Sequence, residues 1–305
     1  MASRGDKIHL DGKNTENDPY TCQSESPLNP GIYINKSLTL VGFGPKSPHI
    51  RCPEGLTFDG CDDDQQMHTT LSGLFLDKSL VRFQDSSVNI DRCKFEGSKR
   101  GVQFLVRTRM VSNIQITDTA FVNSSECMSA VVNKAMNQSE DVLINFTLKD
   151  SSFQGIAMSD EGRCLSFSES SDNKHSVSFN ITLENVEFSD NKFSSKGLFF
   201  LDMGNGNQDI NLQRAKFIKN SALPRPNVFR NGGHSELIVN SNSVNIFINE
   251  SNFSGTNGRS FLVNASSISM EIFNSSFGGN TCEGNGGVIF LKGTDLCRVK
   301  VKFST

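Results

Sequence analysis

The chain has 305 residues, of which 36% are hydrophobic, and its 30 basic and 33 acidic residues give a net charge of −3. No run of basic residues occurs, so we expect no nucleic-acid partner. No stretch of about 18 apolar residues occurs, so we expect no membrane span in this chain, and the polar start from Met1 to Asp6 is not a signal peptide.

Short strand-like segments open the chain. Apolar and polar residues alternate in them with the period of a β-strand. The segments are Lys7 to Leu10, Gly31 to Ile34, Ser37 to Gly44 and Thr70 to Leu76. We expect residues 1–36 to form an N-terminal capping region or first coil. Residues 37–305 are expected to continue it as one solenoid, so that the chain forms a single domain.

One short phrase then recurs seven times. It reads apolar, any, apolar, any, any, small, any, Phe, and its first copy is Val88-x-Ile90-x-x-Cys93-x-Phe95. The phenylalanines are separated by 26, 32, 35, 29, 36 and 24 residues. Repeats of this length are typical of solenoids, in which each repeat buries its apolar face against the next. The seven are Phe95, Phe121, Phe153, Phe188, Phe217, Phe253 and Phe277.

Each phrase predicts two short strands joined at a corner. The alternation slips by one residue inside the phrase, and the chain must bend there if both apolar sets are to face the core. Polar pairs such as Asp91-Arg92 and Thr117-Asp118 occupy this corner. A further apolar cluster, for example Val102 to Val106, predicts a third strand. The sequence thus predicts an all-β, single-stranded parallel β-helix with three short strands in each coil of 24–36 residues, and the general chirality of parallel crossovers predicts a right-handed one.

The composition predicts a ladder of aromatic rings inside the coils. The chain has 24 Phe, 2 Tyr and no Trp. Stacked coils place equivalent residues in register, so the seven phenylalanines are expected to form one column in the core. Phe suits such a column because it has no polar atom that would need a buried partner.

Several motifs resemble those of known families. A strand, the turn Gly42-Phe43-Gly44 and then the strand from Ser72 to Leu76 resemble the opening coils of pectin-lyase-like right-handed β-helix proteins. The endings Phe188 to Asn191, Phe217 to Asn220 and Phe277 to Asn280 resemble polymorphic outer-membrane-protein repeats of bacterial adhesins. They are also similar to large uncharacterised β-helix surface proteins of marine invertebrates. The resemblance covers roughly residues 30–305 and implies the fold, which hosts many functions.

Two features favour the secretory pathway. The chain has nine Asn-x-Ser/Thr acceptors for N-glycosylation, none of them on a position predicted to face the core. They are Asn35, Asn123, Asn137, Asn145, Asn180, Asn249, Asn252, Asn264 and Asn274. The chain also has eight cysteines, an even number that is compatible with disulfides.

We expect disulfides within an N-terminal and within a C-terminal group of cysteines, although sequence alone does not give the connectivity. The groups are Cys22, Cys52 and Cys61, and Cys282 and Cys297. Cys93 takes the small inward position of its phrase, where a buried free thiol is as good an interpretation as a bridge.

The chain ends inside a repeat. Arg298 to Thr305 begins a new coil, and an open coil exposes unpaired strand groups that need a cap. We therefore expect a fragment of a longer secreted or cell-surface protein, which also accounts for the missing signal peptide. The alternative is an intracellular protein with reduced thiols.

An acidic loop is the best candidate for a metal or catalytic site. Asp59, Asp62, Asp63 and Asp64 lie in one short segment. Such carboxylates can bind calcium or serve the chemistry of β-helix enzymes that cleave polysaccharides. The competing interpretation is a solvated loop, because no spaced ligand pattern follows. The outward residue before each Phe also changes from coil to coil, so no carboxylate column repeats. That residue is in turn Lys94, Ala120, Ser152, Glu187, Lys216, Asn252 and Ser276.

We therefore expect no catalytic residues and no cofactor, with calcium at the acidic loop as the one exception. The leading interpretation is a non-enzymatic extracellular recognition, adhesion or structural module whose partners are glycans or proteins. Its candidate binding edges are the long loops at 133–142, 168–178 and 218–235. The alternative is a carbohydrate-active β-helix enzyme, a polysaccharide lyase or glycoside hydrolase, or a catalytically inactive relative.

Overall fold

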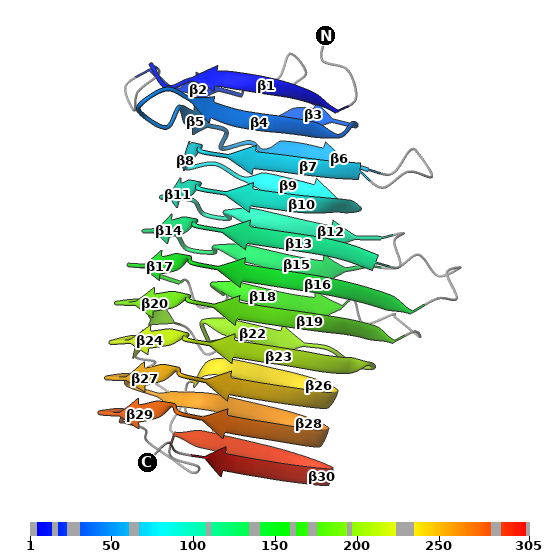
Figure 1. Ribbon diagram of the computed structural model, residues 1–305, viewed down its shortest axis with the longest axis vertical. Helices are drawn as coiled ribbons and strands as arrows, with labels where there is room; N and C mark the ends of the chain where they lie inside the picture. Colours follow the sequence, from blue (N-terminus) through cyan, green and yellow to red (C-terminus); the bar gives the residue numbers. More distant parts are fainter. Residues whose placement is uncertain are drawn as a thin grey trace.

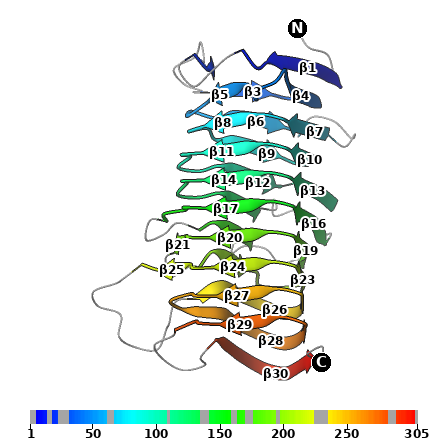
Figure 2. The ribbon, with the colours of Figure 1, turned by 60° about the vertical axis from the view of Figure 1, so that its left-hand side comes forward.

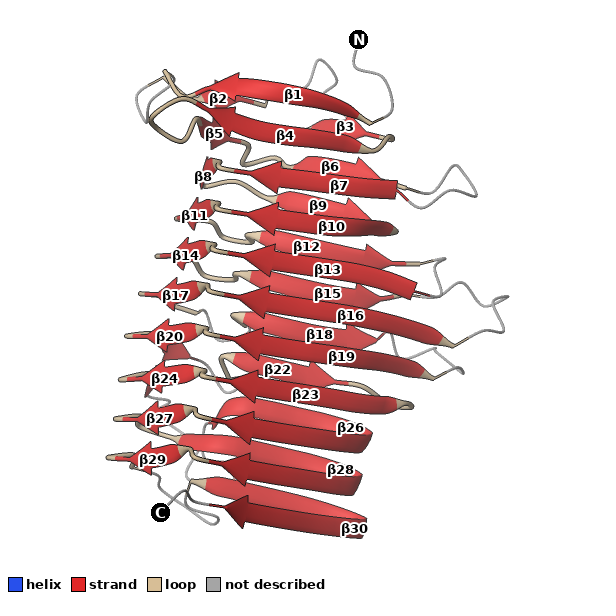
Figure 3. Cartoon of the chain, viewed as in Figure 1, coloured by secondary structure: helices blue, strands red, loops and turns tan. Residues whose placement is uncertain are grey.

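The computed structural model of the protein consists of stacked β-strands. Within the residues it describes, every regular element is a strand and there is no helix (Figure 3). The strands follow one another along the long axis, from the N-terminal strands at one end to the C-terminal strand at the other (Figure 1). The all-β prediction is confirmed. The described residues are 5–13, 18–22, 31–60, 67–107, 111–133, 141–158, 163–169, 176–193, 197–223, 235–281 and 288–302.

The strands form three series of parallel pairings, two of them within one 18-stranded sheet. The first series, the long-strand ladder, contains β1 (Asp6–Asp11), β4 (Leu38–Phe43), β7 (Met67–Ser72), β10 (Ser86–Asp91), β13 (Val111–Thr117), β16 (Val142–Lys149), β19 (Val177–Glu184) and β23 (Asn207–Gln213). The second series, the middle ladder, contains β3 (Ile32–Ile34), β6 (Leu56–Asp59), β9 (Val81–Gln84), β12 (Val102–Val106), β15 (Met128–Val132), β18 (Leu165–Glu169) and β22 (Phe199–Asp202).

The third series is a separate 10-stranded sheet of very short strands, the short-strand sheet (Figure 2). It contains β2 (Tyr20–Thr21), β5 (His49–Arg51), β8 (Phe75–Asp77), β11 (Lys94–Glu96), β14 (Ala120–Val122), β17 (Ser152–Gln154), β20 (Glu187–Ser189), β24 (Lys216–Ile218), β27 (Asn252–Ser254) and β29 (Ser276–Gly278). A further pair is formed by β21 (Lys192–Phe193) and β25 (Ser221–Ala222). Parallel strands stacked in this way are compatible with the predicted parallel β-helix.

Three long strands join the two ladders of the large sheet at the C-terminal end. They are β26 (Ser235–Asn249), β28 (Arg259–Phe273) and β30 (Ile289–Lys302). β26 pairs with β22 through residues 237–240 and with β23 through residues 243–249. In earlier repeats the equivalent strands are separate elements, such as β22 and β23, whereas here one strand passes through both positions.

A left-handed residue makes the predicted bend between each long strand and the following short strand. The backbone explains the one-residue shift in the alternation of apolar and polar residues. A single residue with positive φ turns the chain and returns the next apolar side chain to the core. Most of these residues are the polar type that tolerates this conformation best. They are Arg92, Asp118, Asp150, Asn185, Arg214, Glu250 and Asn274, with φ between 45° and 54°.

The seven phenylalanines of the phrase occupy one column of the short-strand sheet, in register from strand to strand. Successive rings are stacked with centroids 4.5 to 4.9 Å apart and interplanar angles of 3° to 10°. Phe95 to Phe253 of this column are completely buried, and Phe277 at its end is partly buried. A second stacked column, of Phe58, Phe83 and Phe104 in the middle ladder, was not predicted.

Buried asparagines form a polar column at the corner after the short strands. The Asn191 amide donates to the carbonyl of Phe153 (3.0 Å), and its Oδ1 accepts from the N–H of Ile156 (2.9 Å). Asn220 repeats the contact on the carbonyl of Phe188 (3.0 Å). Buried backbone groups that the tight corner leaves unpaired thereby gain partners, which explains the Phe-x-x-Asn endings.

Candidate functional site

The acidic loop predicted from the sequence is described only at its first residue. Asp59 ends β6, is 8% exposed, and accepts a hydrogen bond from the hydroxyl of Tyr33. Asp62, Asp63 and Asp64 lie outside the described residues. Among the residues that are described, no three or more His, Cys, Asp or Glu side chains gather as a metal site would require.

The glycosylation acceptors lie on the surface wherever the structure describes them. Asn137 is outside the described residues. None of the other eight is buried, and Asn145 and Asn180 occupy the same position on adjacent strands β16 and β19. The amide of Asn180 donates to Oδ1 of Asn145, and the amide of Asn145 donates to Oδ1 of Asn113, each at 2.9 Å. The exposed amides thus form a column on the outer face of the long-strand ladder.

Most of each loop proposed as a binding edge lies outside the described residues: 134–140, 170–175 and 224–234 are not described. No helix capable of crossing a membrane occurs in the part of the chain that the structure describes.

A polar groove of about 450 Å³ lies across the outer face of the short-strand sheet. Three neighbouring strands, β17, β20 and β24, form it, and they lie side by side in Figure 2. Its floor includes the outward residues Ser152, Glu187 and Lys216, which are in register with one another. Its rim at the corner carries the left-handed residues Asp150, Asn185 and Arg214, and Gln154 and Ser189 complete the other side.

Hydrogen bonds fix the rim of this groove. The Arg214 guanidinium donates to Glu184 Oε1 (2.6 Å) and to Asn185 Oδ1 (3.0 Å). The Asn185 amide in turn donates to Asp150 Oδ1 (2.7 Å). Side chains from three successive repeats are thereby linked across the strands at the exposed corner.

The floor of the groove contains a cationic side chain, Lys216, that is less closely paired than Arg214 at the rim. The ammonium of Lys216 is 3.9 Å from Glu187 Oε2, and the Lys216 side chain is 57% exposed. A pair at this distance and exposure is weak in water, so both side chains can turn toward a ligand. The groove therefore offers donors and acceptors for hydroxyl or carboxylate groups.

From the sequence, Ser152, Glu187 and Lys216 are only outward residues before each Phe, in a column of mixed polar type. Asp150, Asn185 and Arg214 are only polar residues at the predicted corners. The sequence did not show that three repeats together hollow out a groove, because insertions elsewhere make each repeat a different length. The register of the strands is what brings Ser152, Glu187 and Lys216 together.

A buried carboxyl group lies in the interior of the protein, beside the corner that follows β24. Glu236 is completely buried at the start of β26, and its Oε1 accepts hydrogen bonds from the Asn220 amide (2.9 Å) and the Thr256 hydroxyl (2.8 Å). Burial raises the pKa of Glu236 to about 7, although these hydrogen bonds oppose the rise. No sequence signal distinguishes this glutamate from those at the surface.

No known protein family matches this chain, and neither a search of characterised proteins nor a search of solved structures found a similar protein.

Proposed function

We propose that the chain is a non-enzymatic extracellular recognition module that binds polysaccharide along its outer face. We further propose that it is a right-handed parallel β-helix of the pectin-lyase-like type, with three short strands in each coil. The three series of in-register parallel pairings support this architecture, and the parallel crossovers favour the right hand.

The groove on β17, β20 and β24 is the observation that carries the proposed function. Adjacent parallel strands are about 4.8 Å apart, so the polar groups of Ser152, Glu187 and Lys216 recur at that interval along the molecule. A polysaccharide is itself a repeating chain of hydroxyl groups, and a groove with repeating donors and acceptors can bind several of its units at once.

Two features support an extracellular location. Cys22 and Cys52 form a disulfide, a bond that persists mainly in oxidising compartments. The eight described acceptor asparagines lie where an attached glycan would point into solvent. A protein partner on the same face is the competing form of this proposal.

Binding to a panel of acidic and neutral polysaccharides tests the proposal, with protein secreted from eukaryotic cells. Lys216→Ala should weaken binding of the glycan by about tenfold, the equivalent of 1.4 kcal/mol. Lys94→Ala is the matched control, because Lys94 occupies the same outward column on β11, outside the groove. Equal losses of glycan affinity in both variants would show that the groove is not the binding site.

A steric pair sharpens the same test. Ser189→Trp should block the groove, whereas Ser254→Trp places the same ring in the same column two strands further on. Binding that survives Ser189→Trp unchanged would contradict the assignment.

A further inference from the structure

Cys127 and Cys164 lie side by side on neighbouring strands. Cys127 precedes β15, Cys164 precedes β18, and the strands pair with Met128 opposite Leu165. The carbonyl of Cys164 accepts hydrogen bonds from the N–H of Cys127 (3.3 Å) and the N–H of Met128 (2.8 Å). The backbone therefore holds the two cysteines at equivalent positions of successive repeats.

Their sulfur atoms face each other inside the core. The two Sγ atoms are 3.0 Å apart, and both residues are completely buried. Neighbouring parallel strands are about 4.8 Å apart, which lies within the range of about 4.4–6.8 Å that a disulfide requires between Cα atoms. The spacing of neighbouring strands is therefore suited to a disulfide between the two residues.

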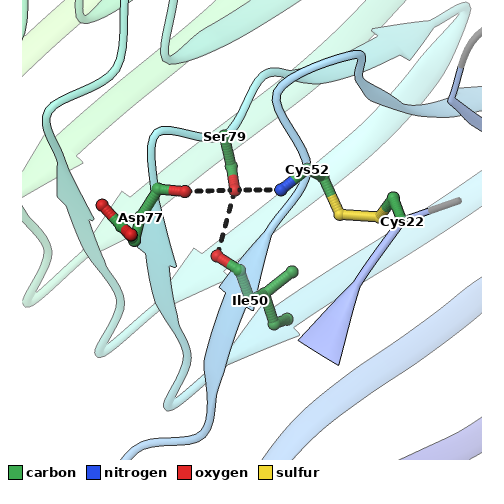
Figure 4. The surroundings of a disulfide bond; sticks show 5 residues. All are labelled: Cys22, Ile50, Cys52, Asp77 and Ser79. Carbon is green, nitrogen blue, oxygen red and sulfur yellow. Dashed lines mark hydrogen bonds between the residues drawn. A yellow bond between two sulfur atoms is a disulfide. The ribbon is translucent and has the colours of Figure 1, made fainter. Parts of the chain in front are cut away.

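The chain already contains a disulfide with the same relation between its cysteines. Cys22 follows β2 and Cys52 follows β5, and the strands pair with Thr21 opposite Arg51. Their Cα atoms are 4.9 Å apart, and Figure 4 shows the bond joining the two successive strands beside the buried hydroxyl of Ser79. The separations along the chain are also similar, 30 residues for this pair and 37 for Cys127 and Cys164.

We infer that Cys127 and Cys164 form a second disulfide that links successive repeats in the middle of the molecule. The oxidant is a small or protein disulfide of the secretory pathway, such as oxidised glutathione. The Cys127 thiolate attacks one sulfur of this disulfide, forms a mixed disulfide, and releases one glutathione. The Cys164 thiolate then attacks the Cys127 sulfur, the new S–S bond forms, and the second glutathione leaves. The protein thiols give up two electrons and two protons, and both are recovered in two reduced glutathione molecules.

The burial of the pair determines when this bond forms. Burial raises the pKa of the Cys164 thiol well above its usual value, and the thiolate is the attacking species. Exchange is therefore slow once the core has closed, and the bond forms while the repeats are still docking. After closure the same burial keeps reductants away from it.

Cys93 provides the internal contrast. It is also buried, but the equivalent position of the next repeat is Thr119, whose hydroxyl accepts a hydrogen bond from the Cys93 N–H, and not another cysteine. Cys93 should therefore remain a thiol in the same protein that contains the two bonds.

Peptide mapping of secreted, non-reduced protein tests the inference. The protein is denatured with an alkylating reagent present, digested and analysed by mass spectrometry. The expected result is a peptide pair joined through Cys127 and Cys164, beside the Cys22–Cys52 pair that proves the preparation oxidised, with Cys93 alkylated. Alkylation of Cys127 and Cys164 while Cys22–Cys52 is linked would overturn the inference, and so would a bond from either residue to any other cysteine.

Variants give a second measurement that does not depend on the digest. Cys127→Ala, Cys164→Ala and the double variant should each lower the urea midpoint of the oxidised protein by a similar amount, since each removes the same bond. Cys93→Ala is the control for loss of a buried thiol. Reductant should lower the wild-type midpoint by more than it lowers that of the double variant, because the double variant retains only the Cys22–Cys52 bond of the two. An equal effect of reductant on the two proteins, or a double variant whose loss is the sum of the single losses, would contradict the bond.

Discussion

The aromatic column in the core and the polar corner at the end of the short strands stack in the same register, yet different forces stabilise them. Rings such as Phe153 are completely buried and stacked on the next ring, and they contribute apolar area and dispersion contacts. Asn191 at the corner is equally buried, but its role is to pair backbone groups that would otherwise be left without partners. Apolar contacts therefore hold the repeats together, and polar side chains pair the backbone groups at most of the corners.

This difference explains the pattern of variation along the chain. The aromatic column is Phe in all seven phrases, since one rung of another size would leave a cavity or a clash. The corner changes its side chain from repeat to repeat: most repeats place a hydroxyl or an amide there, and one places the apolar Ile156, whose backbone N–H donates to Asn191 of the next repeat. The equivalent positions are Ser79, Ser98, Ser124, Ile156, Asn191, Asn220, Thr256 and Asn280.

The largest effect is expected from a cavity in the aromatic column. Phe153→Ala should lower the free energy of unfolding by about 3–5 kcal/mol, because Phe153 stacks on Phe121 and Phe188 with no exposed surface. Urea unfolding measures it. Phe247→Ala is the control, since Phe247 is 36% exposed on the outer face, and it should cost about 1 kcal/mol or less. Similar losses for the two variants would show that the column is not the main source of cohesion.

The corner, unlike the aromatic column, contains a group that titrates. The folded state holds a proton on Glu236 up to its pKa of about 7, whereas the unfolded chain releases it near the ordinary 4.5. The free energy of unfolding should therefore fall as the pH rises from 4.5 to 7, by up to about 3 kcal/mol. Urea midpoints across this range measure the change.

Glu236→Gln isolates this contribution, because glutamine keeps the oxygen that accepts from Asn220 and Thr256 but never ionises. The variant should be more stable than wild type at pH 8 and equal to it at pH 4. Parallel pH profiles for the two proteins would show that Glu236 does not hold the proton.

Removal of one corner amide should have the next largest effect. Asn191→Ala leaves the carbonyl of Phe153 and the N–H of Ile156 buried without their partner, which costs about 2–3 kcal/mol. Asn113→Ala is the matched control, because Asn113 makes its side-chain hydrogen bond on the exposed outer face and is not a glycosylation acceptor. If the Asn191→Ala protein were as stable as the control, water would be pairing the backbone groups at this corner, and the prediction would be wrong.

The smallest loss of stability is expected at the corner between a long strand and the following short strand, where Ser151 places a hydroxyl group. The hydroxyl of Ser151 accepts from the N–H of Thr119 (3.1 Å) and donates to the carbonyl of Lys149 (2.7 Å). Ser151→Ala should cost about 1 kcal/mol, and Val186 and Ala215 already occupy the equivalent position in later repeats. A loss larger than that of Asn191→Ala in the same urea series would reverse the ranking of the two corners.

The sequence predicted the strands and the aromatic column because both depend on a period that each repeat carries. The interval from Val88 to Phe95 is the same in every phrase, so the alternation, the bend and the register of the rings follow from it. For Cys22 and Cys52, the sequence predicted only that a disulfide forms within a group that also includes Cys61. The groove, the pairing of Cys127 with Cys164 and the buried Glu236 depend on which residues insertions of unequal length bring side by side. That information lies in the register between repeats and not within any one of them.

The central claim, an extracellular module that binds polysaccharide without cleaving it, is tested most directly by one incubation with the polysaccharide panel, with and without calcium. Bound glycan and released oligosaccharide are measured in the same samples. The account predicts retained glycan and no released product, with weaker retention by Lys216→Ala than by Lys94→Ala. Released oligosaccharide would contradict it and direct attention to the carboxylates of the 59–64 segment, and the failure of every polysaccharide to bind would contradict it in favour of a protein partner.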